Sequence, residues 1–339
     1  MARSVGILVL ALTLPLTRNF LDSHLLEFSD ESLIKSGINF AGKNVVITGA
    51  NSGIGLSLAT TATALGANVI MACRSLERCS SARMSIAEKN YDVNNVNVLQ
   101  LDLSDIESIK RFTGSVEFGQ VDYLFNNAGF AVKPSTGVTH TIQQHLEVGL
   151  GSMHFGHFYL TMDLIESGKI KEGSSRVIMT SSAAGQFEWA TGGRFHKSIL
   201  AGDGEGDLKG EITTVSSFNF YGRAKLANTL FSRELYERHR VEGCSAHVGA
   251  VATNIWAFGG GMQVLVDAYV RMTMRSIEEG SRVLWKCALS DDKIVVGGAY
   301  MDAGGGVRGE SLLSGPSVDD ELQKALWSVS EKYYGDYKK

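Results

Sequence analysis

Proline and an excess of basic residues are both lacking in this chain. Its 339 residues include only 3 prolines, and its formal net charge is −4, with a pI near 6.1. Proteins that bind nucleic acids usually carry a clear basic surplus, so this charge balance argues against a nucleic-acid partner. The 38 glycines suit tight turns between strands and helices, since so little proline is atypical of collagen-like or disordered chains.

Cysteine is also scarce, and its spacing fits no common metal or redox motif. The chain has 4 cysteines and no CxxC pair, which disfavours a zinc ribbon or a thioredoxin-like site. Disulfide frameworks are typical of smaller secreted domains. The sequence therefore predicts free thiols in a reducing compartment at Cys73, Cys79, Cys244 and Cys287.

The apolar segment near the N-terminus is too short for an ordinary membrane-spanning helix. Val5–Leu16 reads VGILVLALTLPL, which as a helix would cover about 18 Å of a hydrocarbon core ~30 Å thick. Three interpretations stay open: a membrane-dipping anchor, a cleaved signal or transit segment, and a packed helix. An anchor would place the protein at an endomembrane such as the endoplasmic reticulum, and the alternative location is the cytoplasm.

From Lys43 onward, short β-rich runs alternate with segments of helical periodicity. This alternation predicts a single α/β domain, a doubly wound Rossmann-like parallel sheet with helices on both faces. An N-terminal hydrophobic segment and linker would occupy 1–42, and a catalytic domain 43–339, with an inserted loop at about 186–217. Ser104 is the expected N-cap of the third helix. The predicted strands are 44–49, 67–73, 96–103, 121–129, 175–182, 244–249 and 298–301, and the predicted helices are 54–65, 76–89, 104–112, 142–165, 219–240, 262–274, 278–289 and 319–334.

A glycine-rich turn, TGANSGIG at 48–55, joins the first predicted strand to the first predicted helix. Turns of this kind let the backbone approach a pyrophosphate, and the free N–H groups of the following helix attract its charge. The spacing G-x-x-x-G-x-G differs from the commonest fingerprint, G-x-G-x-x-G, and a purely structural turn is the alternative. The residues expected to bind the dinucleotide here are Gly49, Asn51, Ser52, Gly53, Ile54 and Gly55.

The residue after the second predicted strand indicates which dinucleotide binds. Enzymes that use NAD usually place an acidic residue there to bind the ribose 2′-hydroxyl. This strand ends in ACR, without an acid. The guanidinium of Arg74 matches the geometry of a 2′-phosphate. The sequence therefore favours NADP(H) over NAD, the alternative being a solvated surface arginine.

The segment YGRAK places Tyr221 and Lys225 four residues apart, on one face of a predicted helix. Free tyrosine has a pKa near 10, and a neighbouring ammonium stabilises the phenolate and lowers that pKa. Tyr221 is therefore the candidate general acid/base. Ser182, at the end of the fifth predicted strand, is a candidate for binding the substrate oxygen. It lies in no GxSxG elbow, so serine-hydrolase chemistry is unsupported.

Taken together, these motifs resemble the short-chain dehydrogenase/reductase family over about residues 43–305. The elements that occur in the family's order are TGANSGIG, LDLS with Asp102, NNAG at 126–129, SSAAG at 181–185 and YGRAK at 221–225. The features similar to the retinol-dehydrogenase-like branch are ACR, HFGHF at 154–158, HVGAVAT at 247–253, GGAYMD at 297–302 and the apolar N-terminal segment.

The resemblance implies roles for individual residues. Tyr221 would be the general acid/base, Lys225 would tune it and bind the nicotinamide ribose, and Ser182 would orient the substrate carbonyl. Asp102 and Leu103 would hold the adenine end of the cofactor. Asn127 would contact its centre, and Thr253 would approach the nicotinamide amide.

Two positions depart from the family pattern. Met153 stands where the family has a catalytic asparagine before the H-x-G-H-F stretch, and Val248 replaces the proline of HPG. A methionine side chain cannot bind the water that relays protons to the lysine. His154 and His157 are spaced to share a metal ion, but no matching acidic or cysteine cluster accompanies them, so no metal is expected.

The leading hypothesis is an NADP(H)-dependent oxidoreductase that interconverts a carbonyl and an alcohol on a lipophilic small molecule, retinoid-, steroid- or fatty-aldehyde-like. A cofactor-binding scaffold or sensor with little turnover is the alternative, because of Met153. A nucleotide-sugar epimerase is a more distant one, since its substrate domain would need a longer C-terminal region. Membrane attachment through 5–16 and a homo-oligomer are both compatible with the sequence.

Overall fold

A computed structural model of the chain describes residues 23–117, 119–130, 140–186, 199, 208, 214–251, 274–308 and 319–339. The strands are β1 (Asn44–Thr48), β2 (Asn68–Cys73), β3 (Val96–Gln100), β4 (Tyr123–Asn126), β5 (Arg176–Ser181), β6 (Glu242–His247), β7 (Gly297–Met301) and β8 (Val307–Arg308). The α-helices are α3 (Asp30–Lys35), α4 (Gly53–Ala64), α5 (Leu76–Ala87), α6 (Ile106–Ser115), α7 (Val148–Leu150), α8 (His157–Glu166), α12 (Thr214–His239), α14 (Ile277–Leu289), α15 (Lys293–Val296) and α16 (Asp320–Lys338). Two 3-10 helices, η2 (Ser23–Phe28) and η5 (Ala183–Gln186), and a π-helical turn, η4 (Gly151–Gly156), complete the elements.

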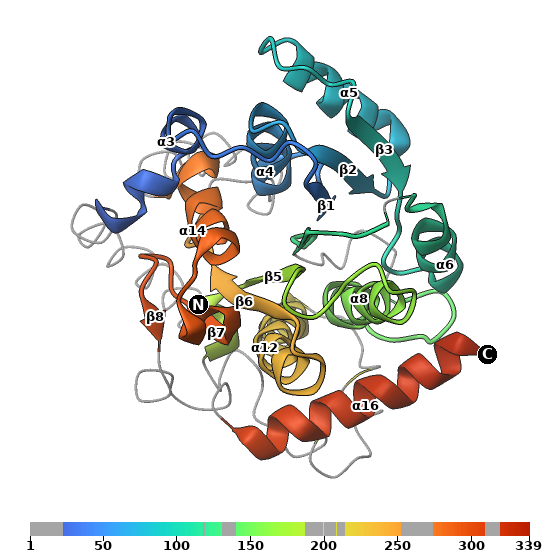
Figure 1. Cartoon of the computed structure of the whole chain (residues 1–339). Helices are drawn as coiled ribbons and strands as arrows, with labels where there is room; N and C mark the ends of the chain where they lie inside the picture. Colours follow the sequence, from blue (N-terminus) through green and yellow to red (C-terminus); the bar gives the residue numbers. More distant parts are fainter. Residues whose placement is uncertain are drawn as a thin grey trace.

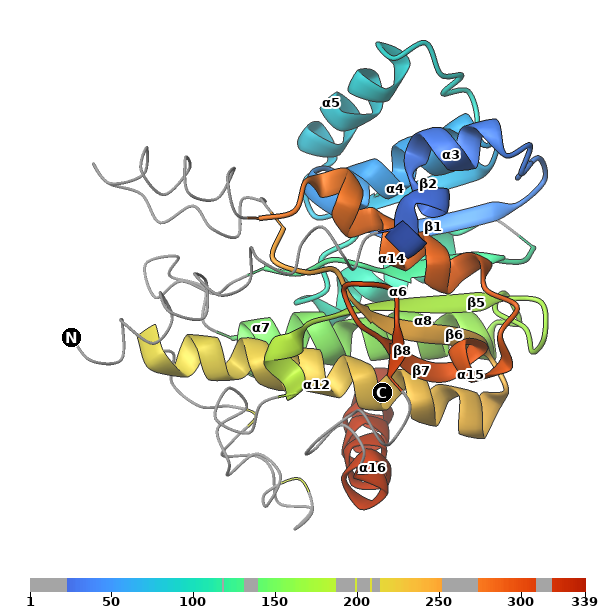
Figure 2. The ribbon, with the colours of Figure 1, turned by 90° about the vertical axis from the view of Figure 1, so that its left-hand side faces the viewer.

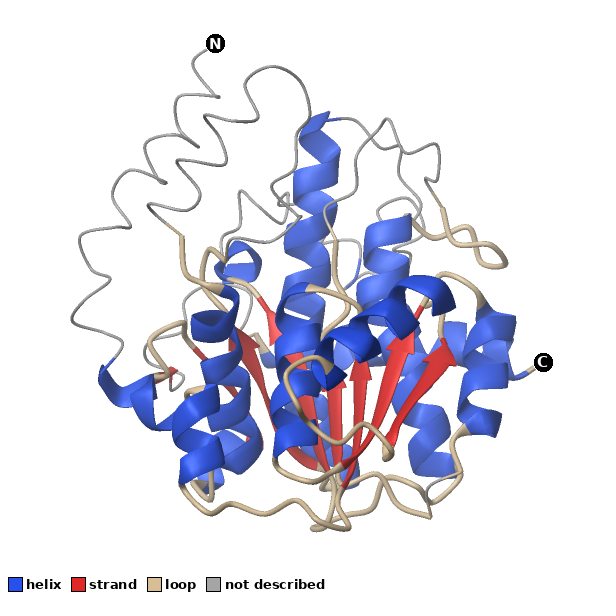
Figure 3. Cartoon of the chain, turned by 90° about the horizontal axis from the view of Figure 1, so that it is seen from above, coloured by secondary structure: helices blue, strands red, loops and turns tan. Residues whose placement is uncertain are grey.

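The strands form one sheet in the order β3-β2-β1-β4-β5-β6-β7-β8. All neighbouring pairs are parallel except β7 with β8. The chain runs outward from β1 to β3 and then crosses back to β4, so the strand order reverses between β1 and β4. Figure 3 shows the long strands side by side with their arrowheads at the same edge. Open α/β sheets bind ligands at the carboxyl edge, where the order reverses.

Helices cover both faces of this sheet, as the alternating pattern predicts. In Figures 1 and 2, α4 and α14 lie on one face, and α8 and α12 on the other, with α16 outside α12. Val45 and Ile47 of β1 enter the core beneath α4 and α14, while Val46 between them enters the opposite core. Each face of the sheet thus has its own apolar core, and burial on both faces is typical of parallel sheets. The predicted fold class is confirmed.

Local hydrogen bonds set most helix starts. Ser75 caps α5, and Ser276 with Glu279 forms a capping box on α14. For α6, however, the N-cap is Asp105 and not the predicted Ser104. The Ser104 backbone N–H and hydroxyl instead bond the Asp102 carboxylate, at 2.9 and 2.7 Å.

The long helix predicted over 142–165 begins later than expected and is irregular. It starts at Val148, widens into the π turn η4, and continues as α8. Before it, His145 has φ of +54°, a left-handed conformation that interrupts a helix. Buried Glu147 caps the start by accepting hydrogen bonds from the N–H groups of Gly149 and Leu150 at 2.9 and 2.7 Å. Periodicity could not reveal this boundary, since the apolar spacing continues through it.

The described residues before Lys43 pack on the helices that cover one face of the sheet. Leu25 and Leu33 are almost fully buried in the core beneath α14 and α4, and the Ser57 hydroxyl donates to the Asp30 carboxylate at 3.2 Å. Apolar packing therefore continues across residue 42, where the sequence analysis placed the end of the N-terminal segment. Among the described residues, none of the helices is both long and apolar enough to cross a bilayer. The apolar segment 5–16 lies outside the described residues.

The prediction of four free thiols is wrong. Cys73 is bonded to Cys79, and Cys244 to Cys287, with Cα–Cα separations of 6.1 and 5.9 Å. Each bridge links a strand to a helix packed on it: β2 to the following α5, and β6 to α14. Neither the absence of a CxxC pair nor the length of the chain could reveal this pairing, because it depends on where the helices pack against the strands.

Candidate active site

The glycine-rich turn after β1 lies at the carboxyl edge of the sheet, where the strand order reverses. Gly49 has φ of +68°, which favours glycine. A side chain on Gly55 would place its Cβ 2.4 Å from the Gly49 carbonyl oxygen and 2.7 Å from Asn127 Nδ2. Both glycines are therefore required by the backbone itself. The N-cap of α4, Ser52, makes no capping hydrogen bond with its side chain, which leaves the first N–H groups of the helix for an anion.

The other residues predicted to bind the dinucleotide at this turn differ in burial and in what their side chains contact. Ile54 is buried, and its side chain contacts the core near Gly280, so only its backbone can face a cofactor. Asn51 is half-buried. Asn127, on the neighbouring turn after β4, donates from Nδ2 to the Thr48 carbonyl oxygen at 2.9 Å, which joins the two turns.

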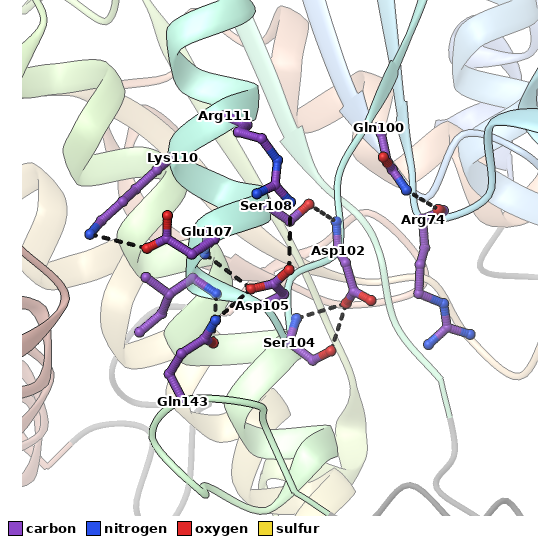
Figure 4. A network of polar contacts seen from close by, with 11 residues as sticks. Arg74, Gln100, Asp102, Ser104, Asp105, Glu107, Ser108, Lys110, Arg111 and Gln143 are labelled. Atoms are coloured by element: carbon purple, nitrogen blue, oxygen red, sulfur yellow. Dashed lines mark hydrogen bonds and ion pairs between the residues drawn. The ribbon is translucent and has the colours of Figure 1, made fainter.

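Arg74 and Asp102 lie together at the ends of β2 and β3 (Figure 4). Arg74 is exposed, and its carbonyl oxygen accepts a hydrogen bond from Gln100 Nε2 at 3.4 Å. In Figure 4 its guanidinium extends away from Gln100, and no dashed line joins it to another residue drawn. One oxygen of Asp102 is held by Ser104. The two side chains can thus face the adenosine end of a dinucleotide.

Tyr221, Ser182 and Lys225 are brought together by α12 and the end of β5. The Ser182 hydroxyl lies close enough to the Tyr221 hydroxyl to act on the pKa of the phenol through hydrogen bonding. The Lys225 Nζ lies 5.6 Å from the centre of the Tyr221 ring. A Cβ on Gly185 would lie 2.6 Å from the Leu226 backbone nitrogen, so η5 packs directly on α12. This close approach places the serine beside the tyrosine, as the sequence predicted.

Burial dominates the electrostatics of this group. Lys225 is 2% exposed, and burial lowers the pKa of its ammonium to about 8. Burial also raises the pKa of Tyr221, and the hydrogen bond with Ser182 opposes that rise. The direction for Tyr221 is opposite to the lowering expected from the lysine, because removing the phenolate from water costs more than these neighbours recover.

Lys225 is held by the end of β5 and retains hydrogen-bonding capacity. Its Nζ donates to the Thr180 carbonyl oxygen at 2.9 Å, and the same oxygen accepts from Asn228 Nδ2 at 3.2 Å. An ammonium has three donors, and within the described part of the chain Thr180 supplies its one hydrogen-bond partner. The other N–H groups can therefore bind the hydroxyls of a ribose.

Met153 lies beside this ammonium. A Cβ on Gly129 would be 3.2 Å from Lys225 Nζ and 3.5 Å from Met153 Sδ, so the ammonium and the thioether border the same glycine. Met153 is almost fully buried within η4. The neighbouring His154 and His157 have separate partners, Ser330 and Thr48, each at 2.9 Å.

The remaining predicted residues lie away from the cluster of Tyr221, Ser182 and Lys225 or outside the described residues. The Leu103 carbonyl oxygen would be 2.4 Å from a Cβ on Gly156, so the loop after β3 packs on η4. Val248 is half-buried against the core under α14. Thr253, most of the inserted loop and the helix predicted over 262–274 lie outside the described residues.

Sequence reasoning missed two residues that shape the site. The Thr48 hydroxyl accepts the backbone N–H groups of Asn127 and Ala128 at 3.0 and 2.9 Å. His157 contacts that hydroxyl. Both lie inside motifs that the sequence analysis quoted, TGANSGIG and HFGHF. Their shared polar character within apolar surroundings was the available signal.

Comparisons with known proteins agree on one group of relatives. The family model described as short chain dehydrogenase matches residues 43–196. Retinol dehydrogenase 12 of Mus musculus is 33% identical over 335 residues, covering 96% of this chain and 95% of the relative. Its Homo sapiens counterpart is 30% identical, covering 91% and 92%. A crystal structure of a putative uncharacterized protein from Mycobacterium paratuberculosis has a TM-score of 0.60 at 26% identity, covering 88% of this chain and 95% of that one.

Proposed function

Because the chain belongs to the short-chain dehydrogenase family, in its retinol-dehydrogenase-like branch, we propose that it is an NADP(H)-dependent oxidoreductase interconverting a carbonyl and an alcohol. One observation carries this proposal: Tyr221, Ser182 and Lys225 lie together in one cluster. No single part of this arrangement is specific, but a phenol, a hydroxyl and an ammonium gathered beside a dinucleotide turn suit carbonyl reduction.

The residues of this chain fit a nicotinamide dinucleotide. The pyrophosphate would lie on the α4 N-terminus, where only glycine fits at 55. Lys225 would bind the nicotinamide ribose with its remaining N–H groups. When bound, the nicotinamide supplies or accepts the hydride. Val248 and Thr253 would border that ring, as the resemblance implies.

The protein's part of the chemistry is proton transfer and orientation. In the reductive direction the Tyr221 hydroxyl donates its proton to the substrate oxygen, which Ser182 holds by a second hydrogen bond. A neutral tyrosine suits this donor role, and burial raises the pKa of Tyr221, which keeps it protonated. In the oxidative direction the phenolate accepts the proton, and the nearby Lys225 ammonium stabilises it.

Two features support the cofactor and substrate class. Arg74 is exposed at the end of β2, where an acid would select NAD. The mouse and human relatives carry the name retinol dehydrogenase, which favours a lipophilic substrate, retinoid-, steroid- or fatty-aldehyde-like.

We also propose 43–339 as the catalytic unit, with attachment to an endomembrane through 5–16. Carbonate extraction with and without residues 1–20 tests attachment, and light scattering tests a homo-oligomer.

The direct test is turnover of NADPH and NADH with retinal and a panel of lipophilic aldehydes and ketones. We expect NADPH oxidation with at least one substrate, and a loss of about 100-fold or more in kcat for Tyr221→Phe, since general acid catalysis contributes ~10²–10⁴. Tyr236→Phe, on the same helix, is the control and should leave kcat unchanged. Unchanged turnover in Tyr221→Phe would contradict the mechanism.

A cofactor-binding scaffold with little turnover is the second candidate, and Met153 favours it. Its apolar side chain borders the Lys225 ammonium, where the family has an amide. Tight NADPH binding without turnover across the panel would support the scaffold. Turnover gained in Met153→Asn would instead identify an enzyme weakened by this substitution.

A further inference from the structure

His157 is a fully buried histidine that contacts two segments of the site. Its Nδ1 lies 2.8 Å from the Met153 carbonyl oxygen, and its Nε2 lies 2.9 Å from the Thr48 hydroxyl oxygen. A carbonyl oxygen can only accept, so Nδ1 carries the proton and Nε2 accepts from Thr48. The imidazole is thus fixed as one neutral tautomer between β1 and the helix that contains η4.

The Thr48 hydroxyl extends this link to the turn after β4. While it donates to Nε2, its oxygen accepts the backbone N–H groups of Asn127 and Ala128 at 3.0 and 2.9 Å. One donor and two acceptor positions are all that a hydroxyl has. The orientation of this turn therefore depends on the Thr48 hydroxyl donating its hydrogen bond to His157 Nε2. The alternative acceptor, the Phe125 carbonyl oxygen, is 3.3 Å away.

Both ends of the His157 link reach the catalytic lysine. Gly129 directly follows Ala128, and a Cβ there would lie 3.2 Å from Lys225 Nζ. Met153, the residue that His157 holds at the other end, borders the same point with its Sδ at 3.5 Å. The imidazole therefore supports two of the walls around the ammonium without touching it.

We propose that His157 is a positioning residue that holds the Met153 backbone and, through Thr48, the turn at 127–129, and so fixes the place of the Lys225 ammonium beside Tyr221. This inference rests on the proposed function, because it concerns the same site. The π turn η4 makes such support necessary, since a π turn interrupts the regular i→i−4 bonding of a helix.

Three substitutions of His157 separate its two bonds. In His157→Asn the amide nitrogen can replace Nδ1 and keep the bond to Met153. In His157→Gln the longer amide can reach Thr48 instead. His157→Phe keeps the ring volume and loses both bonds. We expect kcat to fall about tenfold or more in His157→Phe and less in the other two, while KM for the aldehyde changes less than about threefold.

His154→Phe is the matched control. His154 lies three residues earlier, is equally buried, and bonds Ser330 of α16 through Nε2, so it has no part in the Thr48 link. Both phenylalanine variants should lower the melting temperature, but His154→Phe should leave kcat within about twofold of wild type. Equal losses of kcat in the two variants, or Asn and Gln variants no better than Phe, would overturn the proposal.

Cofactor binding gives a readout that does not depend on turnover. The dissociation constant of NADPH, measured by fluorescence, should rise about tenfold in His157→Phe and less than about twofold in His154→Phe. If the wild-type protein bound NADPH but reduced no carbonyl, the proposed function would be wrong. The NADPH dissociation constants of the His157→Phe and His154→Phe variants would still test the positioning role of His157. If His157→Phe does not fold, the Asn and Gln variants carry the comparison, and wild-type affinity in both would contradict the proposal.

Discussion

Arg74 follows the end of β2, and Figure 4 shows its guanidinium extending away from Gln100. Its side chain is exposed, and among the described residues no side-chain contact would have to be broken for it to bind a phosphate. A charge-assisted bidentate contact is stronger than a neutral hydrogen bond. Selection between the two nicotinamide dinucleotides should therefore depend on this one side chain.

Arg74→Ala should weaken NADPH binding by about 10- to 100-fold, as expected for the loss of a charged hydrogen bond worth ~1.5–3 kcal/mol. NADH has no 2′-phosphate, so its dissociation constant should change less than about twofold. Isothermal titration with both cofactors measures this difference. Arg78→Ala, an exposed arginine on the same loop-to-helix segment, is the control. An equal loss for both cofactors would show that Arg74 does not recognise the phosphate.

Two elements, α4 and α12, bring the glycine-rich turn and the proposed catalytic side chains to one edge of the sheet. Each depends on a close backbone approach at a glycine. Gly55 lets α4 begin directly against the turn at Gly49, and Gly185 lets η5 pack on α12. Because these approaches are backbone to backbone, neighbouring side chains cannot move aside for a larger residue.

Gly55→Ala should therefore abolish tight NADPH binding, with a loss of more than about tenfold and a lower melting temperature. The added Cβ would lie 2.4 Å from the Gly49 carbonyl oxygen, which forces the turn to move. Gly114→Ala in α6 is the matched control, since nothing lies within 4 Å of its Cβ. Alanine there should stabilise the protein by roughly 0.5–1 kcal/mol. Wild-type affinity in Gly55→Ala would contradict the assignment of the turn.

The whole molecule buries a set of ionisable groups around helix α8. Burial lowers the pKa of both His154 and His157 to about 3. On the outer side, Asp163 accepts hydrogen bonds from the hydroxyls of Tyr334, at 2.8 Å, and Tyr337. These contacts hold α16 against α8, and Figure 1 shows the two helices next to each other. The native state thus needs neutral histidines inside and the hydrogen bonds of Asp163 at the α8–α16 contact.

We therefore expect stability to fall in acid as the histidines titrate. Their folded pKa of about 3 lies below the unfolded value of 6.5, so below pH 6.5 the unfolded chain binds protons that the native state excludes. Each histidine should cost about 1.4 kcal/mol per pH unit as the pH falls from 6.5 toward 3. Their contribution is fully present above pH 6.5.

Thermal unfolding of wild type and His154→Phe between pH 4 and 8 measures this effect. The variant lacks one of the two groups, so the difference in unfolding free energy between the proteins should narrow as the pH falls. Burial raises the pKa of Glu147, which acts in the opposite direction but equally in both proteins. A difference that does not change with pH would show that His154 is not excluded from protonation.

Sequence alone determined the order of strands and helices, the glycine turn and the YGRAK helix. These features depend on periodicity and on residue types close together in the chain, and the structure confirms the strands β1 to β6 and the helices between them, except that the helix predicted over 142–165 starts at Val148. The cofactor-turn, serine and tyrosine residues could be named for the same reason. Their side chains lie at strand ends and on one helical face, and the topology of a parallel sheet brings these positions to one edge.

Only the tertiary structure decided the helix start at Val148, the disulfide pairs and the contacts of His157. The Thr48–His157 contact joins residues separated by 109 positions, and the bond between Cys244 and Cys287 depends on how α14 docks against β6. The direction of the Tyr221 pKa likewise depends on how much water the folded site excludes. Contacts between distant segments and loss of solvent have no local signature, because both arise only when the layers close around the sheet.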